Sequence, residues 1–187
     1  FEIASKEQVK SVLQVLDQKA MSPYGIRLFP DRKERNHFCG PVWVVWEAGF
    51  ASAAGKQNEQ ILLWQLIAQQ IRNCVLHKTF YEVLESDSGI SWRWPGQLWH
   101  AAGFLSMFFY GVLGMNYSEE GLAFSPCVPI QLKDLQIHGI RYRKAILDIY
   151  AHGWGELNEI RLDEQQIKII STKITGLHSV HLIMSNR

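Results

Sequence analysis

The hydrophobic pattern of this chain changes its period near residue 121, and no other feature constrains the fold as strongly. Before that point, apolar residues recur every three or four positions, as in the run 42–53. After it, apolar and polar residues alternate, as in the run 144–150. A period of about 3.6 residues is typical of helices, and a period of two is typical of strands. The sequence therefore predicts a helical part over residues 1–116 and a β-sheet part over residues 117–187.

Four segments of the first part have the apolar spacing of a helix. They cover residues 5–18, 41–54, 58–78 and 96–113. Ser5 and Gln8 have the spacing of a capping box, which would start the first of these helices. The helices are apolar on both faces, which is typical of helices buried on more than one side. Strands are expected to dominate after residue 121 and to form a small antiparallel sheet.

The composition limits the classes of partner. With 187 residues, 47% hydrophobic and 20% charged, the chain can form one core or two small ones. Its 19 basic and 18 acidic side chains give a formal charge of +1, which predicts attraction neither to nucleic acid nor to anionic lipid. The run 96–116 is long enough to span a bilayer, but it contains Gln97, His100 and Asn116. We therefore expect a buried helix there and no membrane partner.

Neither the cysteines nor the first residues of the chain indicate a cellular compartment. Cys39, Cys74 and Cys127 are odd in number and widely spaced, so they are expected to be buried or free thiols. The chain begins at Phe1 without a charged segment leading into an apolar run. No cluster of His, Cys, Asp or Glu has metal-ligand spacing, and no phosphate-binding loop is present. We therefore expect neither a metal nor a cofactor, and the localisation stays unknown.

Aromatic residues concentrate between residues 80 and 124. This stretch opens with an acidic loop, 82–89, and continues through Trp92, Trp94 and Trp99. The C–H bonds of a sugar pack on indole faces, while its hydroxyls need carboxylate and amide partners. Core packing is the ordinary alternative for any single tryptophan. As a group around an acidic loop, these residues predict a carbohydrate site.

Three blocks of sequence carry a resemblance to a known family. They are NHFCGPVW (36–43), EVLESDSG (82–89) and QLWHAA (97–102). Together they resemble the C-terminal part of the six-hairpin, (α/α)6 glycoside hydrolases, which include the glycogen-debranching glucosidase domains and the processing α-glucosidases. The tail, GLAFSPCVP (121–129) and IRYR (140–143), is similar to the β-segment of several of these enzymes. The likeness covers nearly the whole chain in order.

The resemblance implies an α+β fold, in which the last helices of an (α/α)6 toroid precede a small antiparallel β-segment. Because about four helices are present where the toroid needs twelve, it implies a C-terminal piece of a longer glycosidase. Its substrate would be an α-linked glucoside or a related sugar, cleaved with inversion. Glu82 would be the general base, and the general acid would lie outside the chain. The residues implied to bind substrate are Asn36, Trp43, Trp92, Trp94, Trp99 and His100.

Departures from the family pattern keep other functions open. Leu84 and Ser86 stand where the acidic loop of the family has Tyr and Pro, and His100 replaces a Ser. These changes favour an alternative, a non-catalytic carbohydrate-binding or scaffold unit that keeps the aromatic groove. A third reading, a prenyl-transferring or terpene-cyclising toroid, lacks its zinc ligands and its aspartate-rich motif. In either carbohydrate reading, we expect the isolated chain to be inactive and to self-associate or pair with the missing part of the barrel.

Overall fold

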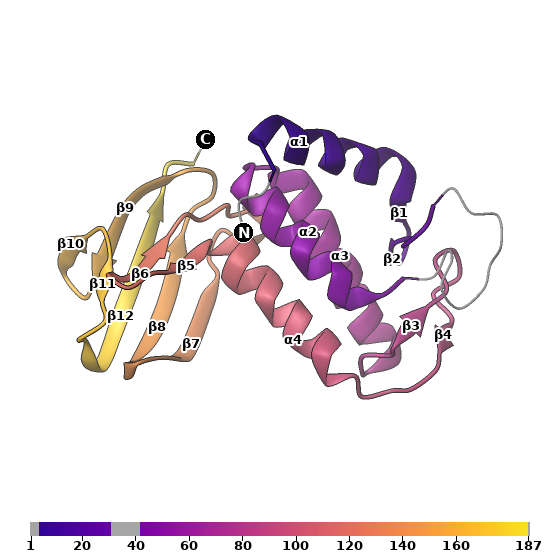
Figure 1. Cartoon of the computed structure of the whole chain (residues 1–187). Helices are drawn as coiled ribbons and strands as arrows, with labels where there is room; N and C mark the ends of the chain where they lie inside the picture. The colour runs from indigo at the N-terminus through magenta and orange to yellow at the C-terminus, as the bar shows by residue number, and fades with distance from the viewer. Residues whose placement is uncertain (1–3, 31–41, 187) are drawn as a thin grey trace. The chain divides into compact units, whose positions relative to one another are not determined.

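The computed structural model of the chain describes residues 4–30 and 42–186. The described residues form four α-helices and strands in four sheets (Figure 1). Two compact units divide the chain, Phe1–Gly111 and Val112–Arg187. Each unit buries apolar residues of its own.

The helices of the first unit overlap the four predicted segments. They are α1 (Lys6–Val15), α2 (Val44–Lys56), α3 (Gln60–His77) and α4 (Leu98–Ser106). π-Helical segments, Leu16–Ala20 and Met107–Val112, directly follow α1 and α4. The capping box is confirmed, because the Ser5 hydroxyl accepts from the N–H of Gln8 at 3.3 Å and the Gln8 side chain accepts from the N–H of Ser5 at 2.8 Å.

Two hairpins in the first unit contradict the expected fold class. One pairs β1 (Met21–Ser22) with β2 (Gly25–Ile26), and the other pairs β3 (Val83–Leu84) with β4 (Ser91–Trp92). Strands of two residues are too short to show a period in the sequence, so no strands were expected in the helical part. The chain is a mixed α+β protein and not a fragment of a helical toroid, so that part of the prediction was wrong.

Small residues let α2 pack closely against the segment that contains α4. A Cβ atom on Gly55 would collide with the backbone carbonyl of Gly111. Gly103 of α4 faces the backbone of Val45, where a Cβ would lie 3.4 Å from the Cα. The backbones therefore leave no room for a side chain at Gly55, whereas at Gly103 a Cβ would just reach van der Waals contact.

The second unit contains two sheets. One has the strand order β11–β6–β5, formed by Ile170–Ser171, Gly121–Phe124 and Met115–Tyr117. The other has the order β10–β9–β12–β8–β7, formed by Gln165–Ile167, Leu157–Leu162, Thr175–Met184, Lys144–His152 and Gln136–Tyr142. β12 and β8 pair in parallel over nine residue pairs, whereas the other neighbours are antiparallel. The expectation of a purely antiparallel sheet was therefore wrong.

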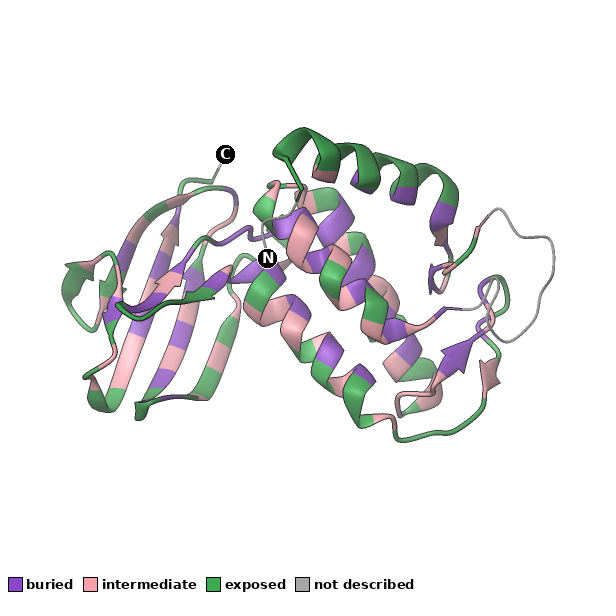
Figure 2. Cartoon of the chain, in the orientation of Figure 1, coloured by how far each residue is buried: buried purple, intermediate pink, exposed green. Residues whose placement is uncertain are grey.

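The alternation predicted for two strands of this sheet is confirmed. Leu147 and Ile149 of β8 are buried, and so are Val180 and Leu182 of β12. The residues between them, including Tyr150, are at least partly exposed, as the alternating colours on these strands show in Figure 2. One face of the sheet is therefore apolar and packs in the core of the unit, and the other face carries polar and aromatic side chains.

Candidate functional site

Glu82 lies just before β3, where backbone hydrogen bonds hold it from two sides. Its N–H donates to the carbonyl of Trp94 at 3.0 Å. Its own carbonyl accepts from Nε2 of His100 at 2.8 Å. The residue is half-buried. Its main chain is therefore fixed on the framework of the unit, while part of its surface stays open to solvent.

His100 is fully buried and joins three elements of the unit. Its Nδ1 accepts from the backbone N–H of Val45 at the start of α2, at 3.0 Å. The ring proton is therefore assigned to Nε2, which donates to Glu82. Burial lowers the pKa of His100, and the hydrogen bond to Glu82 opposes this shift in part. With both nitrogens engaged, His100 positions its neighbours and has no atom left to touch a ligand.

Two tryptophans extend from His100 toward the surface. Trp99 stacks on the imidazole of His100, with ring centroids 5.1 Å apart, and lies edge-on to Trp43 at 6.2 Å. We call Trp43, Trp99 and His100 the ring cluster. Trp99 is 47% exposed and Trp94 is 68% exposed, so both present indole surface to solvent. The ring cluster thus has the exposed aromatic area that a sugar ring needs.

The structure brings most of the predicted site residues to one place. Trp43 and Trp99 are 56 positions apart in the sequence, yet their rings touch, and His100 links them to Glu82. Trp92 lies in the β3–β4 hairpin that follows Glu82, where it is the β4 residue that pairs with Val83 of β3. Asn36 lies outside the described residues.

The other two carboxylates of the acidic loop have structural partners. The Glu85 carboxylate accepts from the backbone N–H of Asp87 at 3.2 Å and of Ser88 at 2.7 Å. Hydrogen bonds from Ser88 are the main cause that lowers the pKa of Glu85. Asp87 forms an ion pair with Arg27 at 2.6 Å. These contacts shape the loop and leave Glu82 as the candidate for chemistry.

Glu47 is a buried carboxyl that the sequence analysis did not single out. It is fully buried in α2, and Oε1 accepts from the N–H of Ile26 at 2.9 Å. Gln70 donates to Oε2. Burial raises the pKa of Glu47 to about 8, so the group is mostly protonated at neutral pH. A protonated carboxyl is what a general acid needs, but this one is completely enclosed and cannot reach a leaving group.

Glu47 is part of a polar network that fixes the β1–β2 hairpin to the helices. Gln69 donates to the carbonyl of Ser22 at 2.6 Å, and Asn73 donates to the carbonyl of Tyr24 at 2.9 Å. The single acidic residue of the apolar helix 44–56, far from the Lys56 that ends it, was the available sequence signal for this network. Because buried polar groups need partners, that charge indicates a contact with a neighbouring backbone.

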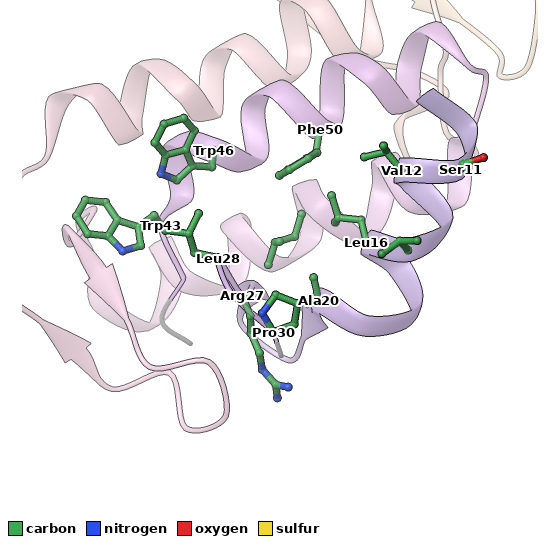
Figure 3. Close-up of a pocket in the computed structure, with 12 residues that line it drawn as sticks. Ser11, Val12, Leu16, Ala20, Arg27, Leu28, Pro30, Trp43, Trp46 and Phe50 are labelled. Carbon is green, nitrogen blue, oxygen red and sulfur yellow. The ribbon is translucent and has the colours of Figure 1, made fainter. Parts of the chain in front are cut away.

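An apolar pocket of about 400 Å³ lies between α1 and α2. Figure 3 shows Trp46 and Phe50 of α2 on one side of it, and Val12 of α1 and Leu16 of the following π-helical segment on the other. Trp43 also lines the pocket, whereas Glu82 does not. The ring cluster and the pocket therefore share one tryptophan, and the predicted carboxylate lies outside the hollow.

A second group of rings lies on the sheet of the second unit. His152 Nε2 and His181 Nδ1 are 2.9 Å apart, and the two rings are tilted by only 15° with centroids 5.2 Å apart. Tyr150 stacks beside His181 at 5.0 Å. Among the described residues, no group of three or more His, Cys, Asp or Glu is arranged to hold a metal ion.

None of the helices in the described ranges is long and apolar enough to cross a membrane. Comparison with known proteins finds no matching family model and no matching curated sequence. The functional argument therefore rests on the arrangement of the residues.

Proposed function

We propose that this chain binds carbohydrate at the ring cluster and supplies Glu82 as the general base of an inverting glycoside hydrolase. The convergence of Glu82, Trp94, Trp99 and Trp43 carries the proposal. Exposed indole faces suit a sugar ring, and a partly exposed glutamate whose main chain is bonded to Trp94 and His100 could accept from its hydroxyls. The proposal does not include the helical toroid, which the strands of the first unit contradict.

Inverting hydrolysis needs two carboxyl groups on opposite sides of the sugar, roughly 6.5–9.5 Å apart. One protonates the leaving oxygen and the other activates water. Glu82 suits the second role because two hydrogen bonds fix its main chain. Glu85 and Asp87 are held by other partners, and Glu47 is enclosed. We therefore propose that the general acid belongs to another part of a longer enzyme.

A non-catalytic carbohydrate-binding unit is the second candidate, and one observation favours it. Leu84 and Ser86, which replace the Tyr and Pro of the family loop, are both buried. Leu84 also exchanges two backbone hydrogen bonds with Val42, at 2.8 and 3.1 Å. These two positions therefore serve packing and cannot contact a substrate. Such a unit would keep the ring cluster for binding and use Glu82 only as a hydrogen-bond acceptor.

The binding half of the proposal can be tested by calorimetry with a series of α-linked glucose oligosaccharides. Trp99→Ala should weaken binding about tenfold, because the exposed indole face is lost. Tyr110→Ala removes a ring of similar exposure, 44%, away from the cluster and should leave the affinity unchanged. A wild-type chain that binds none of these sugars would contradict the proposal.

A further inference from the structure

The pocket between α1 and α2 has walls suited to an apolar guest. Two of its polar lining side chains are already engaged: the Ser11 hydroxyl donates to the carbonyl of Glu7 at 2.9 Å, and Arg27 pairs with Asp87. The other polar side-chain atoms of the lining are the indole N–H groups of Trp43 and Trp46, which can only donate. In Figure 3 the guanidinium of Arg27 points away from the pocket. A sugar placed inside would leave most of its hydroxyls without partners, which is costly in an apolar setting.

Trp43 connects this pocket with the ring cluster. The ring of Trp43 lies against Trp99, which is nearly half exposed. Trp43 also lines the pocket. A ligand with a sugar at one end and an apolar group at the other could therefore contact both sites at once. The volume of about 400 Å³ lies within the usual range of small-molecule pockets.

We propose that the pocket receives the apolar aglycone of a glycoside whose sugar lies on the ring cluster. Alkyl or aryl glycosides should then bind more tightly than free oligosaccharides, which contact the ring cluster alone. The inference rests on the proposed carbohydrate function and specifies its ligand. Its physical basis is the apolar lining of the pocket beside Trp43.

A chain-length series tests the inference. The 187-residue protein is titrated with methyl, butyl, hexyl and octyl α-glucosides, each below its micelle-forming concentration, and binding is measured by calorimetry. Each methylene that becomes buried should tighten binding roughly fourfold, until the pocket is full. Hexanol serves as the sugar-free control and should bind far more weakly than hexyl glucoside.

Two variants place the aglycone in this pocket. Val12→Asp puts a charge on the wall at a position that is 55% exposed, so the helix can tolerate it. In this variant, the ratio of the affinity for octyl glucoside to the affinity for methyl glucoside should fall at least tenfold. Val75→Asp, on α3 at 70% exposure and outside the pocket, is the matched control and should keep the wild-type ratio. Ser11→Phe fills the pocket without adding a charge, and it should lower the same affinity ratio as Val12→Asp does.

The outcomes separate the inference from the proposed function. If all four glucosides bind equally, the inference is overturned while carbohydrate binding stands. If the gain with chain length persists in both pocket variants, the tail binds elsewhere and the inference is also overturned. If hexanol binds as tightly as hexyl glucoside and methyl glucoside does not bind, the sugar contributes nothing and both the inference and the proposed function fail.

Discussion

The two units of the chain bury different kinds of residue. Among the described residues, the buried polar side chains all belong to the first unit: Ser22, Glu47, Gln70, Asn73, Ser86 and His100. In the second unit, the buried positions of the sheet are apolar, as at Leu147 and Val180. Large exposed apolar side chains occur in both units and are most exposed in the first, with Ile61 at 79% and Leu98 at 81%, compared with Leu177 at 70% in the second.

This difference shows where the specialised part of the molecule lies. Burying a polar group is costly unless it is hydrogen-bonded, so a unit optimised for stability alone would avoid it. In the first unit, the buried polar groups hold the β1–β2 hairpin on the helices and fix the main chain of Glu82 next to the ring cluster. The second unit follows simple alternation and needs no such network. If this is so, changes to function and to partner contacts should follow substitutions in the first unit and not in the second.

The largest expected effect is that of Glu82→Gln on turnover. In an enzyme form that includes this chain and its general acid, kcat should fall by about 10² to 10⁴ with little change in KM, because water activation is lost. Asp148→Asn, in the second unit, should leave both constants unchanged. Steady-state kinetics on α-glucosides measures the two variants. Turnover like that of the wild type in Glu82→Gln would remove this residue from the mechanism.

Glu47 should make the stability of the first unit fall as the pH rises. An unfolded Glu ionises near 4.5, whereas the pKa of folded Glu47 is about 8. Between these values only the folded state keeps the proton, so stability decreases from about pH 4.5 to about pH 8 and then levels off. The shift corresponds to roughly 5 kcal/mol as an upper estimate. Denaturant unfolding at pH 5 and pH 8.5 measures the difference.

Glu47→Gln should flatten that profile, since an amide stays neutral and can still accept from Ile26. Glu120→Gln, an exposed change in the second unit, should keep the wild-type slope. Equal slopes in all three proteins would show that Glu47 ionises freely in the folded state.

The features that the sequence predicted are those with a repeating local signal. The 3.6-residue period located all four helices, and the two-residue alternation identified the buried face of β8 and β12. The Ser5 capping box depends on residues three apart and was also predicted. In each case, neighbouring residues in the sequence determine the structure.

The remaining features depend on contacts between distant residues. The hairpins β1–β2 and β3–β4 have two-residue strands and are joined through Val42, which bridges to both Arg27 and Leu84. The parallel pairing of β12 with β8 joins strands that are far apart in the chain. For the site, the tryptophans were predicted by type, but the buried role of His100 follows only from its two backbone partners.

The exposed apolar residues of the first unit predict self-association. Burying a fully exposed Leu or Ile at an interface contributes roughly 1.5–3 kcal/mol. Leu98→Glu should therefore weaken association, whereas Leu177→Glu, 70% exposed in the second unit, should not. Analytical ultracentrifugation measures this, and the same samples should be inactive on aryl glycosides. A monomer that hydrolyses them would contradict both expectations.

Two glycines of the same helix test the close packing of the first unit. Gly55→Ala would place a methyl group against the backbone carbonyl of Gly111, and overpacking of this kind costs about 1–3 kcal/mol. Gly49→Ala meets nothing within 4 Å and should stabilise the helix by roughly 0.5–1 kcal/mol. Thermal unfolding should therefore move in opposite directions for the two variants. Similar shifts would mean that α2 does not approach Gly111 so closely.

The smallest effect concerns the β9–β10 turn of the second unit. Asp163 and His178 form an ion pair at 2.8 Å, and the hydrogen bond between them raises the pKa of His178 and lowers that of Asp163. The His contribution is complete below pH 6.5, its usual value, and is lost as the pH rises through the raised pKa. The Asp contribution is complete above pH 3.8 and is lost as the pH falls through the lowered pKa. The pair therefore stabilises the turn most between about pH 3.8 and 6.5. Over most of that range, the stability that Glu47 gives to the first unit is already decreasing as the pH rises.

Because Asp163 is exposed and His178 is partly exposed, the stabilisation should be below about 1 kcal/mol and should decrease with added salt. Hydrogen exchange of the Ser179 amide, which donates to Asp163 at 2.9 Å, reports it locally. Asn in the Asp163→Asn variant can still accept from Ser179 and adopt the left-handed backbone at φ +52°, but it carries no charge. After correction for the intrinsic pH dependence of exchange, the protection of Ser179 should therefore no longer change with pH in this variant. The neighbouring change Glu164→Gln should preserve the pH dependence. If protection of Ser179 varies with pH in the same way in Asp163→Asn, the ion pair does not stabilise the turn.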